Sequence, residues 1–313
     1  MATASRDFGS SAGFTLLELL VVIGVISVLM GIGVGYLGRT DPEAVAASIL
    51  NGAKREAMMT ARAEGVPTEV EVRPGGGSAP ATVRARLLQP AAVFHFEPNT
   101  PVLDDRLRPD LAGRDVEHGR FGHARRSEAG DKLALLQWRI DPVVADLRDG
   151  FVLRTDLLLE QRTACVVFDA APLLEVRLDD NLVPRARLRL RGDGGENVLA
   201  AVASELSVPL YRWTTLEFGC DGETAWLAVD GREYGREPAR GTPVEPDGAL
   251  QMSPPNAAIP GPVDEVRLLV FGFSPAQNLP AELEPVRLYR FAYDVRGEPV
   301  AHPVVAWKRP EDL

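Results

Sequence analysis

The chain has 313 residues and an acidic balance, with 44 Asp and Glu against 34 Lys and Arg and a formal net charge of −10. Residues 1–39 hold as many basic as acidic side chains, so the negative excess belongs to the remainder. Nucleic-acid binding depends on neutralising phosphates, and docking on anionic lipid needs basic segments, so the composition argues against both kinds of partner. Hydrophobic residues at 45% and charged residues at 25% are ordinary globular values.

An apolar run covers residues 14–38, and Glu18 is its only formal charge. About 20 apolar residues cross a bilayer core as a helix, so residues 14–38 are long enough to form a transmembrane helix. A carboxylate in such a helix costs roughly 2.5–3.5 kcal/mol on insertion scales. A cut after Gly13 creates an α-amino group at Phe14, and this group, with a pKa of about 8, can neutralise Glu18 in the same or a neighbouring subunit.

The short polar leader ending in Gly13, followed by Phe14, Glu18 and an apolar helix, resembles the type IV pilin and type II secretion pseudopilin family over residues 1–64. The resemblance implies that residues 1–13 are a leader peptide, which a prepilin peptidase removes between Gly13 and Phe14. It implies N-methylation of Phe14 and a contact of Glu18 with the next subunit during assembly. It also implies a single-pass protein of the bacterial inner membrane, with its C-terminal domain in the periplasm or, after assembly, on the cell surface.

Two features depart from that family, and one alternative stays open. The leader pairs Arg6 with Asp7, so the positive-inside rule specifies orientation only weakly. Gly35 stands where many pilins have a helix-kinking proline. The alternative is an ordinary signal anchor or signal peptide, but a secretory signal has its small-residue cleavage site after the apolar core, and here that site precedes it.

Residues 39–65 are expected to form an amphipathic continuation of the helix. Asp41 is a candidate N-cap, Pro42 suits the first helical position, and Gly65 marks the end. Apolar residues recur about every fourth position, at Val45, Ile49, Ala53 and Ala57. The rhythm of residues 53–70 resembles minor pseudopilins of the H type.

Beyond the helix the pattern is mostly β. Residues 66–90 read as a β-hairpin connector around a glycine-rich turn, and residues 91–313 as an antiparallel β-sandwich with strands recurring every 10–15 residues. Residues 185–191 alternate arginine with apolar residues, which predicts a strand with one solvated and one buried face. Two Asp-Gly pairs, at 221–222 and 230–231, predict hairpin turns.

The stretch from Trp213 to Arg232 with its Val-Asp-Gly turn, and the later Gly-Pro-Val-Asp-Glu-Val at 261–266, resemble the laminin-G-like, concanavalin-type jelly roll. This resemblance implies a β-sandwich over about residues 91–293 and says little about a ligand. The fold class expected for the whole chain is therefore mostly β, with one long N-terminal helix.

The sequence shows no catalytic constellation, so we expect no enzyme. The four histidines are not in metal-binding spacing, and neither a nucleophile elbow nor a phosphate-binding loop occurs. Asp264 and Glu265 are adjacent, so on one strand they point to opposite faces, and Asp264 reads as a turn or sheet-edge residue.

Three further groups carry open alternatives. Cys165 and Cys220 form either a disulfide or two buried thiols. Loop clusters suit either calcium or ordinary turns, and they comprise Asp179, Asp180 and Asn181, and Asp193, Glu196 and Asn197. Four aromatic residues suit either sugar stacking or core packing, namely Tyr211, Trp213, Trp226 and Tyr234.

These observations together predict a pilin-like subunit of a type IV pilus or type II secretion pseudopilus that displays a laminin-G-like domain. The expected partners are prepilin peptidase, other pilin or pseudopilin subunits and the inner membrane, with carbohydrate as a candidate and nucleic acid excluded. The alternative is a surface adhesin or carbohydrate-binding module that uses the pilin segment only for export and anchoring. A third hypothesis is a solitary membrane-tethered protein.

Overall fold

The structure is a computed structural model that describes residues 41–76, 79–97, 109–141, 145–192, 194–294 and 296–308. The predicted leader, cleavage site and transmembrane helix, with Gly13, Phe14 and Glu18, lie outside these residues. Within the described ranges, no helix combines the length and the apolarity that crossing a bilayer requires.

Helix α2 (Pro42–Glu64) begins and ends at the predicted signals. The Asp41 carboxylate accepts a hydrogen bond from the Glu43 amide at 3.0 Å, and Gly65 takes the left-handed conformation with φ 66°. Its buried face is mostly alanine, so the helix backbone lies close to the sheet beneath it; the buried residues are Ala46, Leu50, Ala53, Ala57 and Ala61. A helix with one buried face therefore occupies most of residues 39–65, and its continuity with residues 14–38 stays a prediction.

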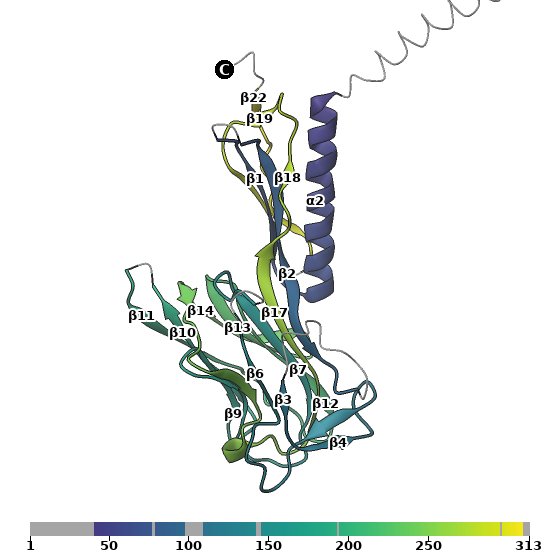
Figure 1. Cartoon of the computed structure of the whole chain (residues 1–313), viewed down its shortest axis with the longest axis vertical. Helices are drawn as coiled ribbons and strands as arrows, with labels where there is room; N and C mark the ends of the chain where they lie inside the picture. Colours follow the sequence, from purple (N-terminus) through teal and green to yellow (C-terminus); the bar gives the residue numbers. More distant parts are fainter. Residues whose placement is uncertain are drawn as a thin grey trace, which may run out of the picture.

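Helix α2 packs on one end of a twelve-stranded antiparallel sheet (Figure 1). The strands beneath it are β1 (Thr68–Arg73), the first half of β2 (Thr82–Phe94), and β20 (Tyr289–Tyr293), with β18 (Gln277–Asn278) and β21 (Pro299–Ala301) beside them. We call helix α2 and these strands the frame. Its core joins the alanine face of α2 to residues such as Val70, Val83 and Phe291.

The same sheet continues into a β-sandwich below the frame (Figure 1). Its order is β14-β13-β12-β7-β17-β2-β1-β20-β21, with β4 and β5 at the side. The strands not yet bounded are β4 (Arg114–Val116), β5 (Ala124–Arg126), β7 (Phe151–Leu158), β12 (Trp213–Cys220), β13 (Thr224–Val229), β14 (Arg232–Pro238) and β17 (Pro262–Phe273).

The second sheet of the sandwich has eight strands in the order β11-β10-β9-β8-β16-β6-β3, with β15 paired to β10. Their bounds are β3 (Asp110–Leu111), β6 (Leu136–Arg139), β8 (Cys165–Ala170), β9 (Leu174–Leu178), β10 (Pro184–Arg191), β11 (Asn197–Ala203), β15 (Thr242–Pro243) and β16 (Ala249–Met252). A short 3-10 helix spans Pro255–Ala257, and a separate two-stranded sheet pairs β19 (Glu284–Pro285) with β22 (Trp307–Lys308). Large side chains such as Trp138, Phe151 and Phe218 fill the space between the two sandwich sheets. The prediction of a mostly β chain with an antiparallel sandwich is confirmed.

The chain passes between frame and sandwich on two long paired strands. Strand β2 leads into the sandwich, and β17 returns beside it, with Phe94 opposite Val266 and Arg86 opposite Phe273. The expected boundary at residues 90/91 falls inside β2. Pro90 does not end the strand, because it lies at a register shift between β2 and β17, where a missing amide donor is tolerated. Residues 274–294 and 296–308 therefore return to the frame, whereas the sequence placed them in the sandwich.

Both Asp-Gly turns join the strands that the sequence predicts. Asp230 and Gly231 have φ values of 51° and 73°, as a two-residue hairpin turn between β13 and β14 requires. At the other turn the Asp221 carboxylate accepts from the Glu223 and Thr224 amides at 3.0 and 2.8 Å, between β12 and β13. The two predicted hairpins are confirmed, and together they make β12, β13 and β14 a three-strand meander.

Candidate functional site

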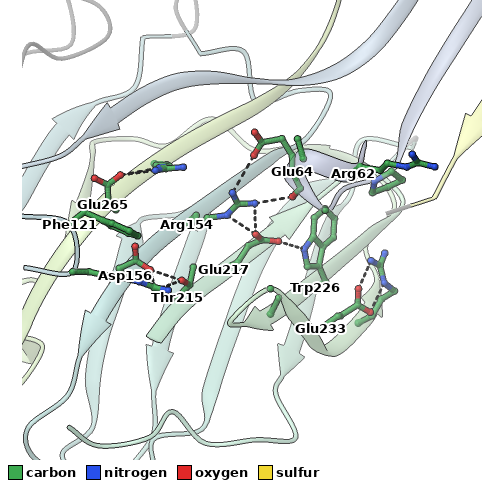
Figure 2. Close-up of a pocket in the computed structure, with 18 residues that line it drawn as sticks. Arg62, Glu64, Phe121, Arg154, Asp156, Thr215, Glu217, Trp226, Glu233 and Glu265 are labelled. Carbon is green, nitrogen blue, oxygen red and sulfur yellow. Dashed lines mark hydrogen bonds and ion pairs between the residues drawn. The ribbon is translucent and has the colours of Figure 1, made fainter. Parts of the chain in front are cut away.

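A cavity of about 470 Å³ lies where the C-terminal end of α2 meets the outer face of the sandwich (Figure 2). We call it the junction cavity. Successive side chains of strands β7, β12 and β13 point to opposite faces of the sheet. One set fills the sandwich core, and the other set faces the junction cavity. Five arginines and five carboxylates line it: Arg62, Arg120, Arg154, Arg236 and Arg267 with Glu64, Asp156, Glu217, Glu233 and Glu265.

Arg154 of β7 joins the helix end to the sandwich. Its guanidinium donates to the Glu64 main-chain carbonyl at 3.0 Å and to the Glu64 carboxylate at 3.2 Å. The carbonyl belongs to the last turn of α2, where carbonyls lack helical partners and the negative end of the helix dipole favours a cation. Arg154 also donates to Glu217 Oε2 at 2.9 Å, so one side chain satisfies groups in both parts (Figure 2).

Trp226 of β13 forms the floor of this junction. Its Nε1–H donates to Glu217 Oε1 at 2.9 Å, and the side chain is buried among Val66, Leu88 and Phe271. Gly219 is its cross-strand neighbour, and a Cβ on Gly219 would lie 2.1 Å from the indole ring. The glycine therefore makes room for the ring that orients the Glu217 carboxylate.

A second group of polar side chains lines the other end of the cavity. Arg120 forms an ion pair with Asp156, and the Thr215 hydroxyl lies 2.5 Å from Asp156 Oδ1. Phe121 follows Arg120 and is 61% exposed, so the loop presents one aromatic ring to solvent. The Phe121 amide donates to Asp264 Oδ2 at 3.0 Å, which ties this loop to β17.

The prediction that Asp264 is a turn or sheet-edge residue is wrong. Asp264 is fully buried in β17, where it lies opposite Asp156 of β7, and burial raises the pKa of its carboxyl group. Glu265 has φ 49° beside a register shift, a conformation that an alternating strand does not predict. Glu265 is 2.6 Å from His95 Nδ1 and accepts from Arg267 at 2.8 Å.

The pairing of charges decides what the junction cavity can do. Each of its five carboxylates has an arginine partner, including Glu233 with Arg236 at 2.6 Å. A general acid or base must be able to exchange its proton with a substrate, and a carboxylate held by a guanidinium is a poor candidate. The arrangement therefore favours a structural joint between helix and sandwich.

The two cysteines are free thiols, so the disulfide alternative is wrong. Cys165 belongs to β8 of the eight-stranded sheet and Cys220 to β12 of the twelve-stranded sheet, and both side chains are part of the sandwich core. Burial raises the pKa of Cys165 to about 12 and that of Cys220 to about 11.

The four aromatic residues proposed for sugar stacking do not gather in one groove. Trp226 is 3% exposed in the junction, while Tyr211 is 72% exposed beside Leu158 and Glu160. Tyr234 packs against the sandwich core, and Trp213 is half-buried at the start of β12. No stacking platform combines them.

Asp179, one of the loop carboxylates proposed for calcium, behaves as a turn residue. Asp179 Oδ1 accepts from the Asn181 and Val183 amides at 2.9 and 3.0 Å, and its Oδ2 accepts from Arg185 at 2.9 Å. Burial tends to raise the pKa of Asp179, but these hydrogen bonds lower it below its ordinary value. Asp193 lies outside the described residues, and no cluster of three metal-ligating side chains occurs among those described.

The five arginines of the junction cavity and their partners Glu64, Asp156, Glu217 and Glu233 are not predicted from the sequence, although Trp226 and Glu265 are singled out there. A signal was present, since Arg154 and Asp156 interrupt an otherwise apolar strand and Glu217 interrupts another. Charged side chains in central strands mark a face that is covered by something polar. The pattern does not reveal what covers it, because Glu64 and Arg154 are distant in sequence.

Comparison with known families and structures adds one finding at the N-terminus. Residues 9–34 match the family described as the prokaryotic N-terminal methylation motif. The chain therefore carries a prepilin-type motif over the residues where the sequence analysis placed it. No curated protein matches the chain at a significant level.

Several solved structures are similar to parts of the chain. Domain 4 of the arabinanase AbnA from Geobacillus stearothermophilus is 14% identical, with a TM-score of 0.42, over 60% of this chain and 95% of that domain. The sialidase CBM40 of Ruminococcus gnavus is 9% identical, with a TM-score of 0.34, over 46% of this chain and 88% of the module. Domains LG4-5 of the mouse laminin alpha1 chain are 13% identical, with a TM-score of 0.30, over 43% of this chain and 37% of theirs. All three TM-scores lie below 0.5, so these likenesses carry no functional information about this chain.

Proposed function

We propose that this chain is a pilin-like subunit that is cut between Gly13 and Phe14, N-methylated at Phe14, and assembled into a type IV pilus or a type II secretion pseudopilus. The match of residues 9–34 to the N-terminal methylation motif is the observation that carries the proposal. Helix α2, which follows that motif in the chain and packs on an antiparallel sheet, supports it. The partners in this proposal are prepilin peptidase and other pilin-like subunits.

In the proposed subunit, residues 14–38 span the inner membrane before assembly, and the sandwich lies on the far side of the membrane from the cytoplasm. Glu18 is the only charge in the apolar run, and it pairs with the α-amino group of Phe14 in a neighbouring subunit. The strands of the frame cover the alanine face of α2, and the sandwich is displayed beyond the end of the helix. A chain with so large a displayed domain is best suited to a minor or tip position.

The ion pairs of the junction cavity support a role in displaying the sandwich. The ion pairs of Arg154 hold the sandwich to the end of α2, so the displayed domain keeps a fixed orientation relative to the helix. The surface of the sandwich is then presented in the same way by each subunit.

The first test is the intact mass and N-terminal sequence of the full chain extracted from membranes of cells with an active prepilin peptidase. We expect a chain that begins at N-methylated Phe14. A chain that begins at Met1 in these cells contradicts the proposal and leaves residues 14–38 as a plain anchor.

A second test separates a filament subunit from a solitary tether. Glu18→Ala should leave processing and membrane insertion intact but abolish co-purification with other pilin-like subunits, because the charge pair with Phe14 is lost. The matched control is Glu56→Ala, which removes an exposed carboxylate from α2. Unchanged co-purification of the Glu18→Ala chain contradicts assembly through this residue.

A further inference from the structure

Strand β10 carries a row of exposed arginines on the outer face of the eight-stranded sheet. Its burial alternates strictly from Pro184 to Arg191, with every second residue buried in the core and every arginine exposed. Residues two apart on a strand are roughly 6.6 Å apart and on the same face, so the row extends over about 20 Å. It consists of Arg185, Arg187, Arg189 and Arg191, and we call it the arginine row.

Most of the arginine row has no neutralising partner. Arg185 pairs with Asp179 at 2.9 Å, and beside the row on β9 Arg177 is 3.7 Å from Glu175. Arg187, Arg189 and Arg191 make no ion pair with any residue that the structure describes. In the register of β9 with β10, Glu175 lies opposite Arg187, whereas Arg189 and Arg191 have no carboxylate opposite them on the described strands. The row is therefore a local positive stripe on a chain of net charge −10.

An exposed apolar strip lies next to the arginine row. In the register of β10 with β11, Arg189 is opposite Leu199 and Arg187 is opposite Ala201. Leu199 is 63% exposed and Ala201 is exposed as well. A ligand on this face would therefore meet cationic groups along one line and an aliphatic surface along the next.

The position of the row leaves it free in the proposed subunit. Helix α2 covers β1, β2 and β20, which belong to the twelve-stranded sheet. Strands β10 and β11 lie at the opposite side of the molecule in Figure 1, in the other sheet of the sandwich. The contacts of α2 within the chain therefore leave this face uncovered.

We propose that the arginine row binds a linear anionic polysaccharide that carries carboxylate or sulfate groups. Guanidinium groups pair with such anions through two parallel hydrogen bonds, and an evenly spaced row matches a polymer better than a compact anion. Sugar rings also present C–H faces, which suit the strip at Leu199 and Ala201. The inference needs only the folded sandwich, so it is independent of processing at Gly13 and of filament assembly.

Single-stranded nucleic acid fits this face less well. Proteins that bind it combine a basic groove with aromatic side chains on which the bases stack. The outer face of β9, β10 and β11 presents no aromatic residue among those described; it holds Glu175 and Arg177, the arginine row, and Asn197, Leu199, Ala201 and Ala203. The acidic remainder of the chain opposes a long phosphate backbone.

The test measures binding of the full chain, in non-ionic detergent, to immobilised polygalacturonate, heparin, dextran and single-stranded DNA. We expect binding to polygalacturonate or heparin that weakens as salt is raised, and none to neutral dextran. The triple variant Arg187→Ser, Arg189→Ser, Arg191→Ser should bind about tenfold more weakly, since each exposed charge contributes modestly. The same three positions changed to Lys keep the charge but lose the two-bond geometry of the guanidinium group, so this variant should bind more tightly than the Ser variant and more weakly than the wild type.

A matched control removes three exposed arginines elsewhere that make no ion pair with described residues, through Arg55→Ser, Arg162→Ser and Arg240→Ser. It changes the net charge equally and should bind like the wild type. Equal loss in both triple variants, or none in the β10 variant, overturns the proposal. Tighter binding to single-stranded DNA than to both acidic polysaccharides also overturns it, in favour of a nucleic-acid surface.

An unchanged melting temperature shows that each variant is folded. A Leu199→Ser variant, which keeps every charge, should weaken binding by a smaller factor than the β10 triple variant.

Discussion

Replacing Arg154 by leucine tests whether the junction is the joint that we describe. The substitution keeps an aliphatic side chain but removes the hydrogen bonds to the Glu64 carbonyl, the Glu64 carboxylate and the Glu217 carboxylate. It leaves the Glu217 side chain, which is 10% exposed, with its charge uncompensated except for the Trp226 N–H. The carbonyl at the end of α2 also loses its donor.

The expected loss of unfolding free energy is about 3 kcal/mol. Removing one partner of a buried ion pair typically costs 3–5 kcal/mol, and the lower end applies because the Arg154 side chain is 18% exposed at the cavity. Much of that cost comes from leaving the negative charge of Glu217 buried without a cationic partner. The double variant Arg154→Leu, Glu217→Gln removes that charge and keeps an acceptor for Trp226, so it should recover about 1–2 kcal/mol.

The assay is chemical denaturation of the full chain in detergent, followed by tryptophan fluorescence, with hydrogen exchange of the last turn of α2 as a local readout. Exchange at Ala61 to Gly65 should accelerate in the single variant. Arg162→Leu is the matched control, because Arg162 is exposed and makes no ion pair with a described residue; it should stay within about 0.5 kcal/mol of the wild type. A loss below about 1 kcal/mol for Arg154→Leu, or a double variant no more stable than the single one, would refute the reasoning.

Three other perturbations test parts of the fold. Gly219→Ala should cost about 3 kcal/mol, because its Cβ would lie 2.1 Å from the Trp226 ring; an unchanged thermal melt would contradict this. Cys165 and Cys220 should react with maleimide at pH 8 only in denaturant, and stability should fall as pH rises from 9, the ordinary thiol pKa, towards 11–12; labelling of the native protein would count against it. Burial favours a raised pKa for Glu71, but hydrogen bonds from Arg73 and Arg84 lower it, so the stabilisation by Glu71 is present above pH 4.5 and is lost as pH falls through the folded pKa. In urea denaturation at several pH values, Glu71→Gln should therefore lose less unfolding free energy between neutral and acid pH than the wild type. An identical pH dependence would disprove this.

Local features of the fold could be predicted because neighbouring residues determine them. Asp41 and Gly65 end the helix through contacts within a few residues, and the Asp-Gly pair at 230–231 supplies the positive φ angles of its turn. The alternation in β10 likewise gives its exposed and buried faces directly. Each of these depends on backbone conformation and side-chain type alone.

The path of the chain and the junction cavity depend on contacts between distant residues. Pro90 suggests the end of a strand, yet the partner strand β17 accommodates it at a register shift, so β2 continues. The bulge at Glu265 places its side chain beside His95 instead of on the face that alternation predicts. Arg154 contacts the Glu64 carbonyl only when the helix packs against the sandwich, and no local sequence pattern predicts this contact.

The route by which the chain crosses into the sandwich has an evolutionary consequence. Strands β2 and β17 are hydrogen-bonded neighbours, so the polypeptide leaves and rejoins the frame at one place. The sandwich is thus an insertion between two paired strands. Its size or loops can change while the points where β2 enters it and β17 leaves it stay side by side. A lineage built on this arrangement can exchange the inserted domain and retain the same helix and the same sheet beneath it.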